Sequence, residues 1–367
     1  MKWSHHISLL SSRPYRMTLQ KRFPTLFNQP YSGEWLTEQE ASFTPNTVSA
    51  YGYALVDYFR FCAIHTINPP DAKRTDITAY HKDLNSRSKS AKDAMPAVGT
   101  GYIRSTTHVG FAKATVRLRL ATVRLYYEYL TEEEIRATNP VKKGKHTKGR
   151  RDGSGRRGLV ARHKKDPWLP NATQWQALLS AASSETIRNR FMLALAYDAG
   201  LRRGELCALE TGDIDPSERL IHLRAETTKN YLARKVPYSQ ATGELYAAYL
   251  QHRRSLSQAP GPLFLSESRR NRGQPITFWT WSKTIEALGK RAGLPFFTTP
   301  TLRHLRLTEL AQAGWKLPQI AAFAGHRDPA TTMLYVHLSG RDLSERFRET
   351  LGSQLDWRQE TIKTSLI

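Results

Sequence analysis

The sequence predicts an α+β protein that is mainly helical, with a small β-hairpin in the second of two domains. Apolar residues recur at the spacing of amphipathic helices in several segments between residues 44 and 335. Two short segments, 220–224 and 234–238, flank the turn residues Thr228-Lys229-Asn230 and are typical of paired strands. The length of 367 residues corresponds to about two domains of ordinary size.

The first domain is expected over residues 42–141, after a basic and weakly patterned arm at 1–41. Its first helix begins at Thr44-Pro45, because proline suits a first turn and apolar residues follow at helical spacing. A second helix is expected over 75–84. Residues 85–111 are rich in Ser, Lys, Gly and Thr, and this composition predicts a loop or insertion.

A stronger apolar stripe follows in the same domain. Its members recur at helical spacing: Val116, Leu120, Val123, Tyr127 and Leu130. The stripe is flanked by Arg117, Arg119 and Arg124. Two interpretations of these arginines stay open, a solvated basic face and a set of contacts to nucleic-acid phosphates.

A basic linker over residues 142–168 separates the domains. It contains Lys142, Lys143, Arg150 and Arg151, interleaved with Gly and Ser and without apolar periodicity. Such a segment does not fold alone, and its self-repulsion favours an extended form. Its charge suits contact with a DNA backbone.

The second domain is expected over residues 169–342. Asn171 and Gln174 form a capping-box pattern at the start of its first helix. An apolar helix over 188–197 ends at Gly200, the hairpin follows, and helices dominate from Phe278 onward. Residues 343–367 form a weakly amphipathic tail.

The charge is the strongest compositional signal. A formal net charge of +23 favours a polyanionic partner, and nucleic acid more than a membrane, because no basic amphipathic anchor stands out. No apolar run approaches a membrane span, and the N-terminus lacks the features of a secretory signal. Cys62 and Cys207 favour a reduced, cytoplasmic protein, and two cysteines with scattered histidines do not predict a structural zinc site.

Three segments of the second domain carry side chains suited to chemistry. Residues 200–206 read Gly-Leu-Arg-Arg-Gly-Glu-Leu, and Thr301-Leu302-Arg303-His304 contains a second arginine. In the third segment, His326 follows a glycine, and Asp328-Pro329 starts a short helix that carries Tyr335. Taken singly, each has an ordinary interpretation as a surface charge, a helix cap or a core tyrosine.

Taken together, in this order and these contexts, the segments resemble the tyrosine recombinase (phage integrase) family. The family's first arginine lies in Gly-Leu-Arg-x-x-Glu-Leu, matched by Arg202, and its second lies in Leu-Arg-His, matched by Arg303. Its lysine lies in a β-hairpin turn, matched by Lys229. Its Gly-His and nucleophilic tyrosine are matched by His326 and Tyr335.

The resemblance implies a helical core-binding domain and a mixed catalytic domain that clamp duplex DNA between them. It covers about residues 170–342, and more loosely residues 42–141. One position departs from the family pattern, because Pro300 stands three residues before Arg303 where the family usually has a histidine. Proline offers no side-chain donor, and losing one donor to a developing anion costs roughly 100- to 1,000-fold in rate.

The resemblance also implies the chemistry. Tyr335 would cleave a phosphodiester and form a 3′-phosphotyrosyl link, which needs no metal, ATP or other cofactor. Arg202 and Arg303 would bind the phosphate oxygens as planar forks, and His326 would add a donor. Lys229 would protonate the 5′-oxygen, with Lys235 and Arg234 as competing candidates.

Two further residues would support the arginines, because Glu205 would orient Arg202 and His304 would lie near Arg303. The resemblance implies a homotetramer on two DNA duplexes, with the tail on a neighbouring subunit and accessory DNA-bending or directionality proteins as further partners. Three alternatives stay open: a weakened recombinase that only binds DNA, a type IB topoisomerase, and an RNA-binding module. The leading prediction is a site-specific recombinase for integration, excision or transposition of a mobile element.

Overall fold

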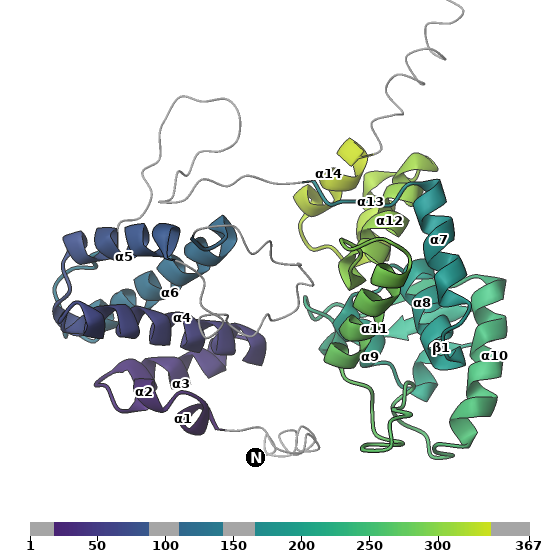
Figure 1. Cartoon of the computed structure of the whole chain (residues 1–367), viewed down its shortest axis with the longest axis horizontal. Coiled ribbons are helices and arrows are strands. Elements are labelled where there is room, and N and C mark those ends of the chain that lie inside the picture. The colour runs from purple at the N-terminus through teal and green to yellow at the C-terminus, as the bar shows by residue number, and fades with distance from the viewer. Residues whose placement is uncertain (1–17, 88–109, 142–165, 339–367) are drawn as a thin grey trace, which may run out of the picture. The chain divides into compact units, whose positions relative to one another are not determined.

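The computed structural model describes residues 18–87, 110–141 and 166–338, and the chain divides into two compact units (Figure 1). The first unit contains residues 18–87 and 110–141, and the second contains residues 166–338. In these ranges no helix combines the length and apolar character that a membrane crossing requires. The expected linker residues Lys142, Lys143, Arg150 and Arg151 lie outside the described residues, as do the expected tail and most of the expected 85–111 insertion.

The first unit is helical. Its elements are α1 (Leu19–Arg22), α2 (Pro24–Phe27), α3 (Ser32–Ser42), α4 (Pro45–Ile64), the 3-10 turn η2 (Pro69–Asp71), α5 (Arg74–Ser86) and α6 (Lys113–Glu132). The long helices α4 and α6 pack against each other, and α5 packs on α6 (Figure 1). The helices expected from residue 44, over 75–84 and along the 116–130 stripe are confirmed.

The expected N-terminal arm is wrong from residue 18 onward. Helices α1, α2 and most of α3 lie in that stretch, and they bury Phe23, Leu26, Trp35 and Leu36 in the core of the first unit. A four-residue helix is too short to show an apolar repeat, so the periodicity of the sequence gave no sign of it.

Arg119 corrects the prediction of a phosphate-contacting face on α6. Its side chain belongs to the core: it is 1% exposed, and its Nη1 donates to Asp57 Oδ2 at 2.8 Å. Its guanidinium lies 3.9 Å from the ring centroid of Phe111. Residue 119 follows Val116 by three positions, so it lies on the buried side of the helix. Arg117 is half-buried, and Arg124 is paired with Glu128.

We expect Arg119→Met to lower the free energy of unfolding by about 2–4 kcal/mol, because it takes an ion-pair partner from a buried carboxylate. Asp57 keeps Arg87 and Tyr80 as donors, which limits the loss. The matched variant Arg117→Met should change stability by about 0.5 kcal/mol or less. Urea unfolding of the full chain, followed by circular dichroism, measures both. Equal stabilities would show that the buried pair contributes nothing.

Among the described residues, the second unit contains eight α-helices, two 3-10 turns and a three-stranded antiparallel sheet. They are α7 (Ala172–Ala182), α8 (Ile187–Asp198), α9 (Arg203–Cys207), η4 (Thr211–Asp213), β1 (Ile214–Asp215), β2 (Leu220–Leu223), η5 (Ala225–Thr227), β3 (Arg234–Pro237), α10 (Gln240–Arg254), α11 (Phe278–Arg291), α12 (Thr299–Gln312), α13 (Leu317–Ala324) and α14 (Pro329–Leu338).

The sheet has the order β1-β2-β3, with Ile221 opposite both Ile214 and Val236. The predicted hairpin is confirmed, and Lys229 lies in its connection. The capping box at Asn171 is also present. Strand β1 and helix α10 were not predicted. The fold class, mainly α with a small β-sheet, is as expected.

The core of this unit holds the site elements together. Helix α8 packs against both α10 and α12, and α12 packs against α13 and α14. The buried side chains of Phe191, Tyr249 and Trp281 contribute to one continuous apolar cluster. Consequently the turn after α8, the start of α12 and the α13–α14 connection are supported by one core.

Candidate active site

Segments far apart in the sequence meet around the backbone of Ala324 and Gly325, where α13 ends. Arg303 Nη2 on α12 donates to the carbonyl oxygen of Ala324 at 2.5 Å. Arg202, which caps α9, donates to the carbonyl oxygens of Ala324 and Gly325 at 3.4 and 3.2 Å. Asn230 in the hairpin connection donates to Gly325 O at 3.1 Å. The two predicted arginines therefore lie at one place.

Glu205 is the buried anion of this cluster, at 1% exposure. It accepts from the backbone N–H of Arg202 at 2.9 Å and from Arg202 Nη1 at 2.8 Å. It also accepts two hydrogen bonds from Arg234, at 2.8 and 3.2 Å. Burial opposes ionisation of Glu205, but Arg234 and Arg202 outweigh it and lower the pKa. The carboxylate orients Arg202, as the sequence predicts, and a second guanidinium as well.

Arg234 belongs to this cluster, whereas the sequence predicts it only as a competitor of Lys229. Besides its pair with Glu205, its Nε donates to Phe323 O at 3.0 Å. The alternation of residues along a strand could have predicted this inward position, because Arg234 and the fully buried Val236 lie on the same face of β3. Lys235, the other competitor, is exposed on the opposite face.

Arg303 is 7% exposed and contacts His326 directly. Its Nη1 donates to Gly200 O at 2.7 Å, and its Nη2 lies 3.0 Å from His326 Nε2. Burial, together with Arg202, lowers the pKa of Arg303 to about 10, so it remains charged at neutral pH. Because a guanidinium only donates, His326 Nε2 accepts here, which leaves Nδ1–H to donate to Thr332 Oγ1 at 2.9 Å. Burial and Arg303 lower the pKa of His326 to about 4.

Tyr335 lies on α14 and is 2% exposed. Its ring stacks on His326 with centroids 6.0 Å apart and planes 8° apart. Its hydroxyl lies 3.1 Å from Nδ1 of His304. Burial raises the pKa of Tyr335, while the charges of Arg303 and Arg202 oppose that rise. His304 thus contacts the tyrosine hydroxyl, whereas the sequence predicts only support near Arg303.

Lys229 is exposed in the hairpin connection, and none of the described residues pairs with it. The cluster reaches its neighbour Asn230 instead. Pro300 is exposed in the first turn of α12, where a missing N–H costs no helical hydrogen bond. The structure therefore has no histidine or other side-chain donor at the position where the sequence departs from the family pattern.

Gly325 is required by its conformation and by its neighbour. Its φ is +63°, and a Cβ there would lie 2.8 Å from Arg234 Nη1. Gly314 also has a positive φ, +81°, but a Cβ there would meet nothing within 4 Å. Comparing substitutions at these two glycines therefore separates the cost of backbone strain from the cost of displacing Arg234.

We expect Gly314→Ala to cost about 1–2 kcal/mol of unfolding free energy, from the left-handed backbone alone. Gly325→Ala should cost at least about 1 kcal/mol more, because it pushes Arg234 away from the buried Glu205. Chemical denaturation of both variants measures the difference. Equal losses would mean that the Arg234–Glu205 pair adjusts freely.

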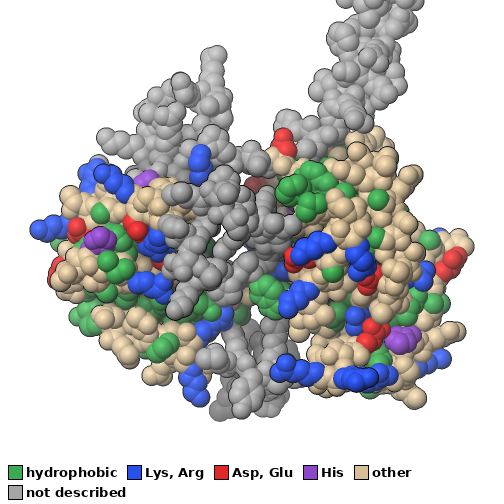
Figure 2. Space-filling model, in the orientation of Figure 1, with side chains coloured by type: hydrophobic (Ala, Val, Ile, Leu, Met, Phe, Trp, Pro, Cys, Tyr) green, Lys and Arg blue, Asp and Glu red, His purple; other side chains and the backbone are tan. Residues whose placement is uncertain are grey.

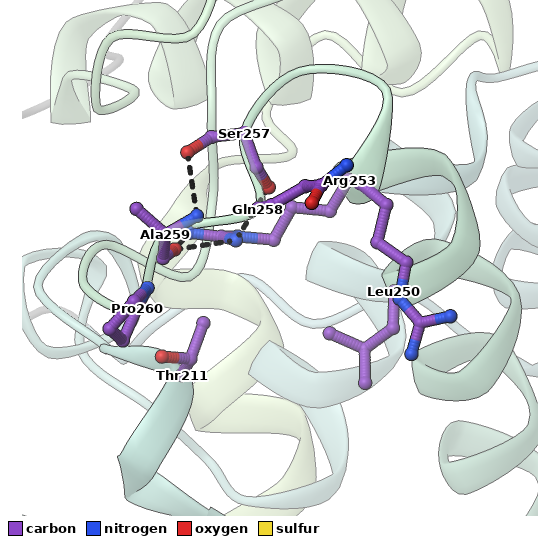
Figure 3. Close-up of a pocket in the computed structure, with 8 residues that line it drawn as sticks. Thr211, Leu250, Arg253, Ser257, Gln258, Ala259 and Pro260 are labelled. Carbon is purple, nitrogen blue, oxygen red and sulfur yellow. Dashed lines mark hydrogen bonds between the residues drawn. The ribbon is translucent and has the colours of Figure 1, made fainter.

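A pocket of about 590 Å³ lies away from these residues (Figure 3). Arg253 lines it and is nearly buried, donating to the carbonyl oxygens of Ser257, Ala259, Pro262 and Leu263. Those bonds hold the loop after α10, which is a structural role. Among the described residues, no group of three or more His, Cys, Asp and Glu side chains is arranged to hold a metal ion.

A buried tyrosine thus lies beside two arginines and a histidine on a mainly helical unit with a small sheet. The Phage integrase family model matches residues 171–341. The tyrosine recombinase XerC of Thermodesulfovibrio yellowstonii is 30% identical over 283 residues, which cover 73% of this chain and 87% of that protein. The chain belongs to the tyrosine recombinase family.

Other relatives agree. XerC of Haemophilus influenzae strain Rd is 25% identical over 284 residues, covering 73% of this chain and 88% of that protein. Two solved structures share the fold. The XerH recombinase bound to palindromic difH substrate has a TM-score of 0.59 at 17% identity, covering 82% of this chain and 79% of that one. The Tn1549 transposon integrase in complex with transposon right end DNA has 0.58 at 15%, covering 86% and 98%.

Proposed function

We propose that this protein is a site-specific DNA recombinase that integrates, excises or transposes a mobile element through a 3′-phosphotyrosyl intermediate on Tyr335. The observation that carries the proposal is one continuous set of contacts. Tyr335 stacks on His326, His326 accepts from Arg303, and Arg303 and Arg202 share the Ala324 carbonyl oxygen. A nucleophile and two permanent cations thus lie within one small volume.

The proposed reaction exchanges one phosphoester for another. Tyr335 Oη attacks the phosphorus, an Oη–P bond forms, and the bond to the 5′-oxygen breaks, so the link keeps the energy needed for rejoining. Arg202 and Arg303 stabilise the charge on the non-bridging oxygens. The carbonyl oxygens of Gly200, Ala324 and Gly325 now accept from these guanidiniums. An entering phosphate would replace some of those acceptors.

Lys229 is our candidate for the acid that protonates the 5′-oxygen. Arg234 is held by Glu205, and Lys235 lies on the far face of β3, so neither competitor suits the role. Lys229 is exposed one residue before Asn230, which contacts the site loop. We assign the acid role to Lys229 on that basis.

The proposed substrate is double-stranded DNA. The net charge of +23 supports a polyanionic partner, and Figure 2 shows more Lys and Arg than Asp and Glu on the visible face. Two structural neighbours are complexes with DNA by their descriptions, the Tn1549 integrase and XerH. We propose that the first unit is the core-binding domain and that Arg117 and Arg124 contact DNA phosphates. The 142–168 linker would cross the DNA backbone, and four copies would assemble on two duplexes.

Covalent trapping tests the function. The full chain is incubated in EDTA with nicked duplexes from the ends of its own element, and a denaturing gel resolves any protein–DNA adduct. We expect a protease-sensitive adduct that forms without metal. Salt-sensitive binding of the same ends with no adduct would favour the alternative, a weakened recombinase that only binds DNA, for which the donor-free Pro300 position is the supporting observation. Adduct formation restored by Pro300→His would then locate the defect.

A further inference from the structure

We propose that His304 is a catalytic residue: its Nδ1 accepts the proton of Tyr335 Oη as that oxygen attacks the DNA phosphate. The inference rests on the proposed function, since it concerns the same cleavage step. Its first support is direct contact, because the two atoms lie 3.1 Å apart, within the range of a hydrogen bond to a general base. Arg303 also interacts with the hydroxyl, but a guanidinium only donates, so it cannot accept the proton as His304 can.

The position of His304 on α12 gives the second support. It follows Pro300 by four residues, so both lie on one side of the helix, one turn apart. On this side of the helix, the side chain of Pro300 can neither donate nor accept a hydrogen bond, whereas that of His304, one turn further along, can do both. It reaches the nucleophile, while the adjacent Arg303 reaches the Ala324 and Gly200 carbonyl oxygens.

The protonation state of His304 suits an acceptor. Burial and the neighbouring Arg303 lower the pKa of His304 to about 4, so the ring is neutral at physiological pH. The titratable and charged groups that face it are Arg303 on its own helix, Tyr335 on α14 and His326 on the α13–α14 connection. His326 Nε2 already accepts from Arg303, so it is not the free base of the cluster.

An entering phosphodiester would make His304 a better proton acceptor. Its negative charge offsets Arg303 and Arg202, so the proton affinity of His304 rises as the substrate binds. In cleavage the Oη–P bond forms, the Oη proton moves to His304 Nδ1, and the 5′-oxygen leaves with a proton from the acid that we assign to Lys229. In rejoining, the imidazolium returns its proton to the departing Tyr335 oxygen.

The test compares two substitutions of His304 in the trapping assay. His304→Ala removes the ring, and His304→Gln keeps a hydrogen-bonding side chain that cannot take up a proton at this pH. We expect both to form adduct about 10²- to 10⁴-fold more slowly. Added imidazole should restore part of the rate of His304→Ala, in proportion to its neutral form across pH. His252→Ala, at a half-exposed histidine paired with Glu267, should keep the wild-type rate.

The outcomes are distinguishable. A Gln variant at the wild-type rate, or an Ala variant without imidazole rescue, overturns the proposal while a Tyr335-dependent wild-type adduct leaves the proposed function intact. No adduct from the wild type overturns both. Imidazole ¹⁵N shifts of the folded wild-type protein provide a readout that does not need the variants to fold. An unprotonated, hydrogen-bonded Nδ1 is expected at His304, and a proton on Nδ1 would overturn the assignment.

Discussion

Tyr335→Phe is expected to abolish the covalent protein–DNA adduct while leaving the chain folded and able to bind DNA. Phenylalanine keeps the ring that stacks on His326 and removes only the oxygen that would attack phosphorus. Losing the nucleophile should lower adduct formation at least about 10⁴-fold, below detection on a gel. The hydroxyl is buried and contacts His304, so the variant should lose about 1 kcal/mol of stability or less.

Tyr246→Phe is the matched control, because Tyr246 is a buried tyrosine of the same unit that packs against Phe191. It should form adduct at the wild-type rate. Binding of the element ends, measured by fluorescence anisotropy at fixed salt, should be unchanged in both variants. An adduct that survives Tyr335→Phe would assign the covalent link to another residue and refute the proposed mechanism.

Glu205→Gln is expected to cost about 3–5 kcal/mol of unfolding free energy, the second large effect. The carboxylate is 1% exposed and pairs with Arg202 and Arg234, so the amide leaves the nearly buried Arg234 and the partly exposed Arg202 without their counter-charge. Arg202 also loses the acceptor that fixes its direction. We therefore expect the surviving folded protein to form adduct at least about 100-fold more slowly.

Glu210→Gln is the control, since Glu210 pairs with Arg224 but is about half exposed; exposed pairs contribute about 1 kcal/mol or less. The pH dependence gives an independent check. The pKa of Glu205 is lower in the folded state, so its stabilisation is present above the unfolded-state pKa and is lost as pH falls through the folded-state pKa. The unfolding free energy of Glu205→Gln should therefore lack this part of the decrease at acidic pH. Urea unfolding that shows equal stability and the same acid limb would mean that the two ion pairs are energetically neutral.

Several helix ends of the second unit and the position of the hairpin follow from local rules and were predicted, whereas α10 and β1 were not. Gly325 ends α13 with a left-handed φ of +63°, and the side chain of Asp328 accepts from the backbone N–H of Ala330 at the start of α14. Such signals act within a few residues, so they are visible in a sequence. The local sequence contexts of Arg202, Arg303, His326 and Tyr335, and their order along the chain, carried the resemblance to the family.

The burial of Arg119 on α6 was not predictable from its neighbours in the sequence. Arginine usually lies on the surface, but residue 119 lies on the same side of the helix as the apolar stripe. It is buried because Asp57 lies opposite it in the core and pairs with its charge. A single sequence reports neither that partner nor the desolvation that the ion pair offsets. The four-residue helices at the start of the first unit failed for a different reason, since they contain fewer residues than an apolar repeat needs.

The sequence by itself determined the class of fold through periodicity and capping, which are properties of short segments. The family and the side chains with chemistry came from the resemblance of short motifs and their order. Tertiary structure alone decided which of those side chains share a site. Glu205 meets Arg234 across 29 residues of chain, and His304 meets Tyr335 across 31. Packing of α12 against α13 and α14, and of α13 against β3, closes those distances, so the anchoring of the guanidiniums and the acceptor beside the nucleophile exist only once the core has formed.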